Sequence, residues 1–210
     1  MKPVLLSIAY LPPISWIAVA LQSGNIVLEI HETYPKQTFR NRCNIATASG
    51  ILSLTIPVNR VNGNHTKTCD IHIDNSKNWQ LLHWRSIITA YNKSPYFLYY
   101  RDLLEPIFFR KYELLVDFNN ELLKAILGAL KIKTIDIFYT TEYEMKTDFY
   151  DFRNSFHPKY INGDVTYTLP KYMQTFEAFH GFLPDLSIID LLFNLGPDAL
   201  PYLTSVKPSV

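Results

Sequence analysis

The chain has 210 residues, a hydrophobic content of 48% and a formal net charge of +1. This length and apolar content are enough to bury a sizeable core, which excludes intrinsic disorder and suits a single domain over residues 1–210. Because 20 Lys and Arg residues nearly balance 19 Asp and Glu residues, the chain has no overall basic field for nucleic acid or anionic lipid. Any anion-binding site must therefore be local.

The N-terminal apolar run begins like a secretory signal, but Pro12-Pro13 interrupts it and no small-residue cleavage site follows. No run is long enough to span a bilayer, so we expect no membrane insertion. Cys43 and Cys69 form no C-x-x-C pair and no disulfide framework, although a bridge between them is compatible with their places on neighbouring predicted strands. These features predict a cytoplasmic protein.

The chain opens with a predicted βαβ unit. Residues 4–10 are almost wholly apolar, as in a central buried strand. Pro13 suits the first position of a helix, apolar residues recur at helical spacing after it, and Gly24 ends it. Residues 25–30 form a second strand. In open α/β sheets, ligands bind near the loop after the first strand, which holds the candidate substrate-binding residues Ser7 and Tyr10.

Alternation of apolar and polar residues predicts half-buried strands over 52–58 and 69–74, with Ser49-Gly50 as a hairpin turn before the first. The period then becomes helical. Helices are predicted from Trp79 to Tyr91, from Pro95 to Leu104 and over 111–130, and a strand over 135–138.

Residues 142–170 have no clear period and predict a long irregular loop. The capping-box pattern Ser187-Ile188-Ile189-Asp190 predicts a helix that begins at Ser187 and ends at Gly196-Pro197. Together the elements predict a mixed α/β (α+β) fold, with a βαβ opening, a central mixed sheet, an antiparallel hairpin and a helical C-terminal half.

A dense polar segment follows the second strand, over residues 31–45. Its arginines, lysine and amides are donors suited to phosphate or carboxylate, so it predicts a cleft that binds an anionic small molecule. A polar edge strand with a solvated face explains the same pattern about as well. The candidate substrate-binding residues here are Lys36, Gln37, Arg40 and Arg42, and in an extended segment the even-numbered ones share one face. Their alternative role is ordinary ion pairing.

His31 and Glu32 are the candidate catalytic pair, because they end a strand beside cationic groups that could tune both pKa values. The alternative is that His31 caps the strand end and Glu32 pairs with Lys36 or Arg40. Near the C-terminus, Asp190 and Asn194 lie four apart on one helix face, where a cap plus an internal hydrogen bond is the simpler interpretation.

Several common site motifs are missing. The six histidines show neither H-x-x-H nor H-E-x-x-H spacing, so no metal site is predicted. The sequence has no Walker A motif, no G-x-G-x-x-G and no G-x-S-x-G elbow, so no cofactor is predicted.

Three stretches of the chain resemble the WbqC-like family. The most specific stretch combines residues 172–176 (YMQTF) with 186–197 (LSIIDLLFNLGP), which resembles the family's Y-x-Q-x-F and L-S-I-x-D-L-L-F-N-x-G-P. Residues 84–97 resemble its W-x-x-I-x-x-A-Y-x-x-x-P-Y-F run, and Arg42 matches an arginine of its N-R-x-R-I region. Many members open with Q-P-x-Y-x-P, whereas here Ser7 stands in place of the glutamine. The chain resembles a Bacteroidetes-type branch.

The family is linked to bacterial surface-polysaccharide (O-antigen) gene clusters. The resemblance implies a place in this pathway and not a reaction. Within the pathway we predict a transferase that acts on a nucleotide-sugar, a sugar phosphate or an acyl donor, with Tyr172, Gln174 and Asp190 near the site from the C-terminal side. The competing hypothesis is a non-enzymatic binding or assembly subunit whose polar segment 31–42 is an interface. A homo-oligomer is compatible with both.

Overall fold

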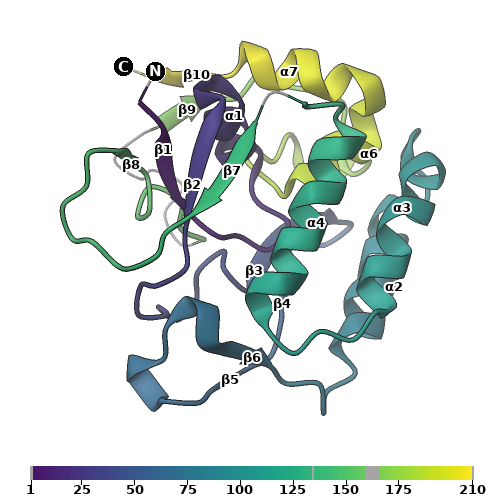
Figure 1. Cartoon of the computed structure of the whole chain (residues 1–210). Helices are drawn as coiled ribbons and strands as arrows, with labels where there is room; N and C mark the ends of the chain where they lie inside the picture. Colours follow the sequence, from purple (N-terminus) through teal and green to yellow (C-terminus); the bar gives the residue numbers. More distant parts are fainter. Residues whose placement is uncertain (1, 134, 159–165, 210) are drawn as a thin grey trace.

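The predicted βαβ unit is present in the structure, a computed structural model that describes residues 2–133, 135–158 and 166–209 (Figure 1). Strands β1 (Val4–Ser7) and β2 (Asn25–Glu29) are parallel, and α1 (Ile14–Ser23) connects them. Pro13 is the N-cap residue of α1, and Gly24 ends the helix at φ 74°. A left-handed backbone at this position favours glycine, which has no Cβ.

The βαβ unit belongs to a four-stranded sheet in the order β7-β2-β1-β8, in which every pair is parallel. The added strands are β7 (Asp136–Tyr139) and the two-residue β8 (Tyr150–Asp151). One face of the sheet, which includes Leu6 and Leu28, packs into the main core. Leu5 and Val27 point to the opposite face, because side chains alternate along a strand.

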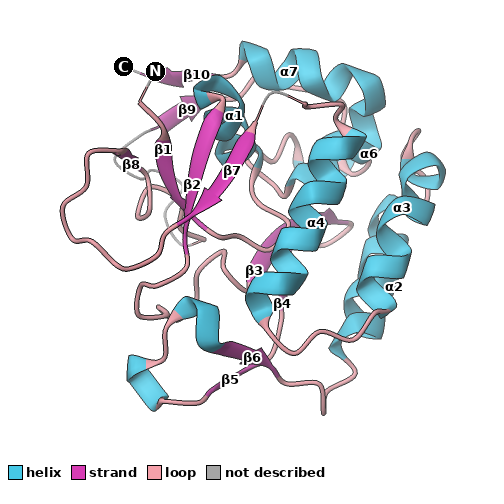
Figure 2. Cartoon of the chain, viewed as in Figure 1, coloured by secondary structure: helices cyan, strands magenta, loops and turns pink. Residues whose placement is uncertain are grey.

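Three antiparallel pairs form two-stranded sheets of their own beside the parallel sheet (Figure 2). They are β3 (Arg42–Thr47) with β4 (Gly50–Thr55), β5 (Val58–Arg60) with β6 (Ile71–Ile73), and β9 (Thr166–Thr168) with β10 (Lys207–Ser209). Short helices η1 (Gly63–His65) and η2 (Thr68–Asp70) precede β6. The mixed α/β class and the hairpin at Ser49-Gly50 are confirmed.

Helices α2 (Trp79–Tyr91), α3 (Phe97–Phe109) and α4 (Leu115–Ala129) pack against one another in chain order. Helix α4 begins later than predicted, because the chain before it runs alongside β6. The Ile73 N–H donates to the Glu113 carbonyl, and Leu114 bridges His72. Helix α3 continues past its predicted end through Pro106, and the buried side chains of Ile107 and Phe108 anchor this last turn.

The C-terminal portion contains α5 (Glu177–His180), α6 (Ile188–Leu195), η3 (Gly196–Asp198) and α7 (Ala199–Ser205). Ser187 is the N-cap residue of α6, as predicted, and residues 191–193 are fully buried. The prediction that the Ser187 hydroxyl caps the helix is wrong. That hydroxyl donates to the Leu11 carbonyl at 2.8 Å, which joins α6 to the loop after β1.

A single hydrophobic cluster contains side chains from Val4 to Val206 and includes the buried faces of α1, α2, α4 and α6. Segment 142–170, predicted to be irregular, contributes the short strands β8 and β9. Residues 159–165 of that segment lie outside the described residues.

Candidate functional site

The carboxyl ends of the four parallel strands define the candidate site. Strand β1 ends at Ser7, β2 at Glu29, β7 at Tyr139 and β8 at Asp151. Ligands of open parallel sheets bind outside this edge, because the strand ends and the loops that follow them converge there. Polar side chains do gather at this edge, in two linked ion-pair groups.

Glu29 organises the first group. Its side chain is fully buried, and Oε1 accepts hydrogen bonds from the backbone N–H groups of His31 (2.7 Å) and Glu32 (3.1 Å) and from Thr140 Oγ1 (3.0 Å). Oε2 lies 3.2 Å from Arg153 Nη1. These contacts engage both oxygens of the buried carboxylate and fix the turn after β2.

Arg153 connects this group to two chain segments. Its Nη2 lies 2.7 Å from Asp151 Oδ2, and Nη1 donates to the Glu144 carbonyl at 2.9 Å. Burial alone would raise the pKa of Asp151, but hydrogen bonds from Arg153 outweigh burial and lower that pKa. The guanidinium also lies over the Tyr143 ring, 5.0 Å from its centroid. Arg153 thus ties the loop after β7 to the end of β8.

The second group joins Arg40, Glu32 and Ser7. Arg40 Nε lies 2.6 Å from Glu32 Oε1, and both side chains are largely buried. Arg40 Nη2 donates to Ser7 Oγ, and Ser7 Oγ donates to the Arg153 carbonyl at 3.1 Å. Three residues predicted for the site therefore meet, and Ser7 links them to Arg153.

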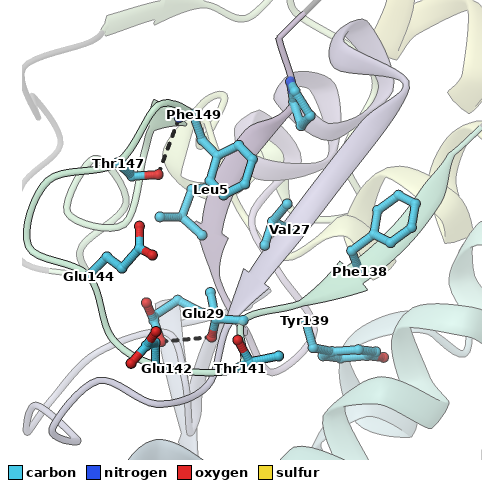
Figure 3. Close-up of a pocket in the computed structure, with 12 residues that line it drawn as sticks. Leu5, Val27, Glu29, Phe138, Tyr139, Thr141, Glu142, Glu144, Thr147 and Phe149 are labelled. Carbon is cyan, nitrogen blue, oxygen red and sulfur yellow. Dashed lines mark hydrogen bonds between the residues drawn. The ribbon is translucent and has the colours of Figure 1, made fainter.

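A pocket of about 420 Å³ adjoins this edge (Figure 3). It lies between the loop after β7 and the sheet face that carries Leu5 and Val27, which we call the outer face. Its floor is Leu5, Val27 and Phe138, from three neighbouring strands. Glu29 lines the end of the pocket nearest the ion-pair groups, together with Thr140, which donates to it. This pocket brings a ligand-sized volume next to the polar edge.

A model of the WbqC-like protein family matches residues 9–151. The chain belongs to the WbqC-like protein family. It is also 29% identical, over 194 residues, to the uncharacterized protein Rv1507c of Mycobacterium tuberculosis, a match covering 81% of this chain and 83% of that protein. No solved structure matches the chain significantly.

Of the other predicted residues of this WbqC-like protein, His31 stays at the strand end, and its ring Nδ1 lies 3.9 Å from the half-buried Cys69 thiol. Lys36 and Gln37 are exposed in a turn, in which Gln37 has a φ of 58°. Because this segment turns before β3, it is not extended, and Arg40 and Arg42 have different surroundings. Arg42 is half-buried on β3, and its Nε donates to Thr55 Oγ1 at 3.1 Å.

Tyr10 lies in the core and not at the sheet edge. Its ring is fully buried against Phe118, and its hydroxyl lies 2.9 Å from His83 Nδ1. Burial raises the pKa of Tyr10 well above its usual value and lowers the pKa of His83 to about 4. The hydroxyl therefore donates, and the neutral imidazole accepts.

Tyr172, Gln174 and Asp190 meet in a second buried network, which also includes Tyr91 of α2. Asp190 Oδ1 accepts from the Tyr91 hydroxyl at 2.9 Å, and Oδ2 accepts from the Tyr172 hydroxyl at 2.5 Å and from Gln174 Nε2 at 3.2 Å. Burial raises the pKa of Asp190 although these donors oppose the shift. Gln174 also bonds both backbone groups of Leu183. This network joins α2, α6 and the segment before α5.

The hypothesis that segment 31–42 is an interface requires its polar side chains to be exposed to solvent. Within it, the exposed residues are Thr33, Lys36 and Gln37. Six of its residues are buried, including both members of the Arg40–Glu32 ion pair. A surface with so few accessible polar groups is poorly suited to an interface built on this segment.

Sequence reasoning missed Glu29, Thr140, Asp151 and Arg153. Glu29 had a usable signal, because an acidic residue directly after an apolar strand occupies the carboxyl end of that strand. Arg153 follows a two-residue strand in a segment without a period, so no pattern could place it. Within the described parts of the chain, no helix is long and apolar enough to cross a membrane, and no group of three or more His, Cys, Asp or Glu residues is placed to hold a metal ion.

Proposed function

We propose that this WbqC-like protein is a cytoplasmic transferase of bacterial surface-polysaccharide biosynthesis, acting on an anionic activated donor such as a nucleotide-sugar, a sugar phosphate or an acyl donor. The observation that carries the proposal is the convergence of Ser7, Glu29, Thr140 and Arg153 at one sheet edge, beside a pocket of about 420 Å³ that has room for a sugar acceptor; the anionic donor is assigned to a separate group of arginines. Both cysteines are free thiols, in keeping with a reducing compartment.

The arginines near the site have two different roles, which depend on whether each pairs with a carboxylate. Arg40 and Arg153 already pair with buried carboxylates, so they position the strand ends. Arg42, by contrast, pairs with no carboxylate among the described residues, and Arg60 lies over the Tyr34 ring at 5.1 Å. We assign the anionic group of the donor to Arg42 and Arg60, because unpaired guanidinium groups suit phosphate.

The environment of Tyr34 supports this assignment. Its ring is buried, and its hydroxyl has no hydrogen-bond partner in the described part of the chain. Burial raises its pKa to about 12, and the positive charges of Arg40, Arg60 and Arg42 oppose this shift.

His31 is the candidate proton acceptor. When the acceptor substrate attacks the transferred group, the bond from that group to the leaving atom of the donor breaks, and the electron pair stays with that atom. The leaving atom is a phosphate oxygen in a sugar donor and the thioester sulfur in acyl-CoA, and the proton of the acceptor substrate passes to the imidazole. Glu32, which is engaged by Arg40, is a positioning residue for this step.

The donor assignment is tested with Arg42→Ala and Arg42→Lys in a thermal-shift screen of nucleotide-sugars, sugar phosphates and acyl-CoA. A bound donor raises the melting temperature of the wild type by mass action. We expect both variants to lose about ten- to a hundredfold in donor affinity, because a charge-assisted contact contributes about 1.5–3 kcal/mol and lysine lacks the planar fork.

Arg85→Ala, which removes an exposed arginine on α2, is the matched control and should bind as the wild type does. Two results oppose the proposal: an unchanged affinity in both Arg42 variants, or no response of the wild type to any donor class. For the reaction itself, mass spectrometry of donor and glycan acceptor mixtures should show group transfer that His31→Ala abolishes without loss of donor binding.

A further inference from the structure

The outer face of the parallel sheet has an unusual cover. Parallel sheets are normally packed by helices on both faces. Here Leu5 and Val27 form the floor of the 420 Å³ pocket, and the loop over residues 140–149 borders it on one side (Figure 3). Arg153 holds this loop in place through the Glu144 carbonyl. The pocket is therefore an open hollow against the sheet, with one side fixed by Arg153.

The charge of the pocket has one sign. Three carboxylates line it, from Glu29, Glu142 and Glu144, and none of the described lining residues has a cationic side chain. The nearby Arg153 does not balance them, because it already pairs with both Glu29 and Asp151. An anion in this pocket would be repelled, whereas an ammonium group would be attracted.

The uncharged residues that line the pocket supply aromatic rings and hydroxyl groups. Phe138 and Phe149 present aromatic rings to the pocket, and these residues are 54% and 36% exposed. Such rings bury the apolar face of a ligand ring and attract a cation over the π-system. The hydroxyl groups of Thr140, Thr141 and Thr147 can each donate and accept hydrogen bonds.

We propose that this pocket binds a sugar that carries a free amino group, with the ammonium group toward Glu142 and Glu144 and the pyranose ring against the aromatic side chains. The inference rests on the proposed function, in which this amino sugar is the acceptor substrate. It separates the two substrates by charge: the cationic acceptor lies in the acidic pocket, and the anionic donor lies at Arg42 and Arg60.

The test compares four probes by calorimetry and methyl NMR at about pH 6.5, where the amine is protonated. They are glucosamine, glucose, N-acetylglucosamine and glucose 6-phosphate. Glucosamine should bind about tenfold more tightly than the two neutral sugars, and glucose 6-phosphate should bind most weakly. The Leu5 and Val27 methyl signals should shift with glucosamine, which places it on the floor of the pocket.

Two variants separate the charge from the aromatic wall. Glu142→Gln with Glu144→Gln should reduce glucosamine affinity to that of glucose, because both residues are exposed and the fold does not depend on them. Phe138→Ala should weaken glucosamine and glucose alike. Glu113→Gln, an exposed glutamate outside the pocket lining, is the matched control and should leave both affinities unchanged.

Equal affinities for glucosamine and glucose would overturn the inference, as would preferential binding of glucose 6-phosphate or unshifted Leu5 and Val27 methyl signals. This result is separable from the donor screen. If the wild type binds an activated donor through Arg42 but not glucosamine, the proposed function stands and the acceptor site is wrong. If glucosamine binds but no donor does, the pocket stands and the transferase does not.

Discussion

Arg40 and Arg42 are two residues apart and have opposite surroundings. The guanidinium of Arg40 is 5% exposed and contacts the Glu32 carboxylate and the Ser7 hydroxyl. Arg42 is half-buried and faces outward from β3, with one hydrogen bond to the exposed Thr55. The same residue type therefore supports the fold at one position and is free to bind a ligand at the other.

Removal of each guanidinium should have a different effect on stability. Arg40→Ala should lower the free energy of unfolding by about 3–5 kcal/mol, because it leaves the buried Glu32 carboxylate unpaired. Arg42→Ala should cost less than about 1 kcal/mol, as expected for an exposed contact. Urea unfolding of both variants measures the difference. A severe loss for Arg42→Ala would make Arg42 part of the scaffold and would remove it from the donor site.

Glu32 provides a check on the Arg40 result. If the unpaired charge causes the loss, Glu32→Gln in the Arg40→Ala background should recover part of the stability. No recovery in the double variant would mean that Arg40 acts through packing and through its contact with Ser7.

At the scale of elements, the position of α6 depends on its N-cap residue, Ser187, through contacts outside the helix. The Ser187 hydroxyl bonds the Leu11 carbonyl, and the Ser187 N–H donates to the Asn44 carbonyl at 2.8 Å. The helix start is thus fixed to the loop after β1 and to β3. The other end of α6 is equally constrained, because a Cβ at Gly196 would lie 2.5 Å from the Tyr96 ring.

Ser187→Ala should destabilise the fold by about 1–3 kcal/mol, since it leaves the buried Leu11 carbonyl without its partner. Thermal and urea unfolding measure this loss. Ser205→Ala removes an exposed, local hydroxyl contact on α7 and should change stability little. Equal effects of the two substitutions would mean that the tie between α6 and the β1 loop contributes nothing.

Elements with strong local signals were predictable from the sequence, and those set by distant contacts were not. Pro13 and Gly24 bracket α1 as expected, and the start of α6 and the turn at Ser49-Gly50 are also in place. Strand β8 has two residues, so it exists through its pairing with β1 and leaves no periodic pattern.

The same distinction applies to the candidate site. Ser7, Glu32 and Arg40 could be predicted because each lies close to a recognisable strand end or in the dense polar segment. Arg153 could not, since its role depends on how the loop after β7 returns to the sheet. The sequence also could not show that Tyr10 faces the core, because a residue after a strand can point to either side.

At the scale of the whole molecule, the net charge of +1 conceals a local separation of charge. Carboxylates line the pocket on the outer face of the sheet, while Arg60 lies over the Tyr34 ring and the charge of Arg42 also acts on the Tyr34 hydroxyl. Ionisable groups are also buried deep in the core, away from both regions. Among these, His83 determines how the stability of the whole fold should respond to mild acid.

His83 is 6% exposed, with Trp79 edge-on to its ring and the Tyr10 hydroxyl on Nδ1. Burial lowers its pKa from 6.5 to about 4, and a hydrogen bond with the Thr55 backbone only partly opposes the shift. The unfolded chain therefore binds this proton first as the pH falls. The contribution of neutral His83 to stability is fully present above pH 6.5 and is lost progressively as the pH falls toward about 4. The difference between the ordinary pKa of histidine and the pKa of His83 in the folded protein corresponds to about 3 kcal/mol in the free energy of unfolding.

Urea unfolding at a series of pH values in that window should show this loss in the wild type. His83→Gln should flatten the dependence, because the amide oxygen can still accept from Tyr10 but the side chain no longer titrates. His65→Gln, at an exposed histidine, should retain the slope of the wild type. Burial raises the pKa of Asp185 and Asp190, so these carboxyl groups gain stability as the pH falls and oppose the effect of His83. Both act equally in the wild type and in His83→Gln, so the difference between the two slopes reports His83. An unchanged slope in His83→Gln would assign the acid sensitivity to other groups and would contradict a neutral, buried His83.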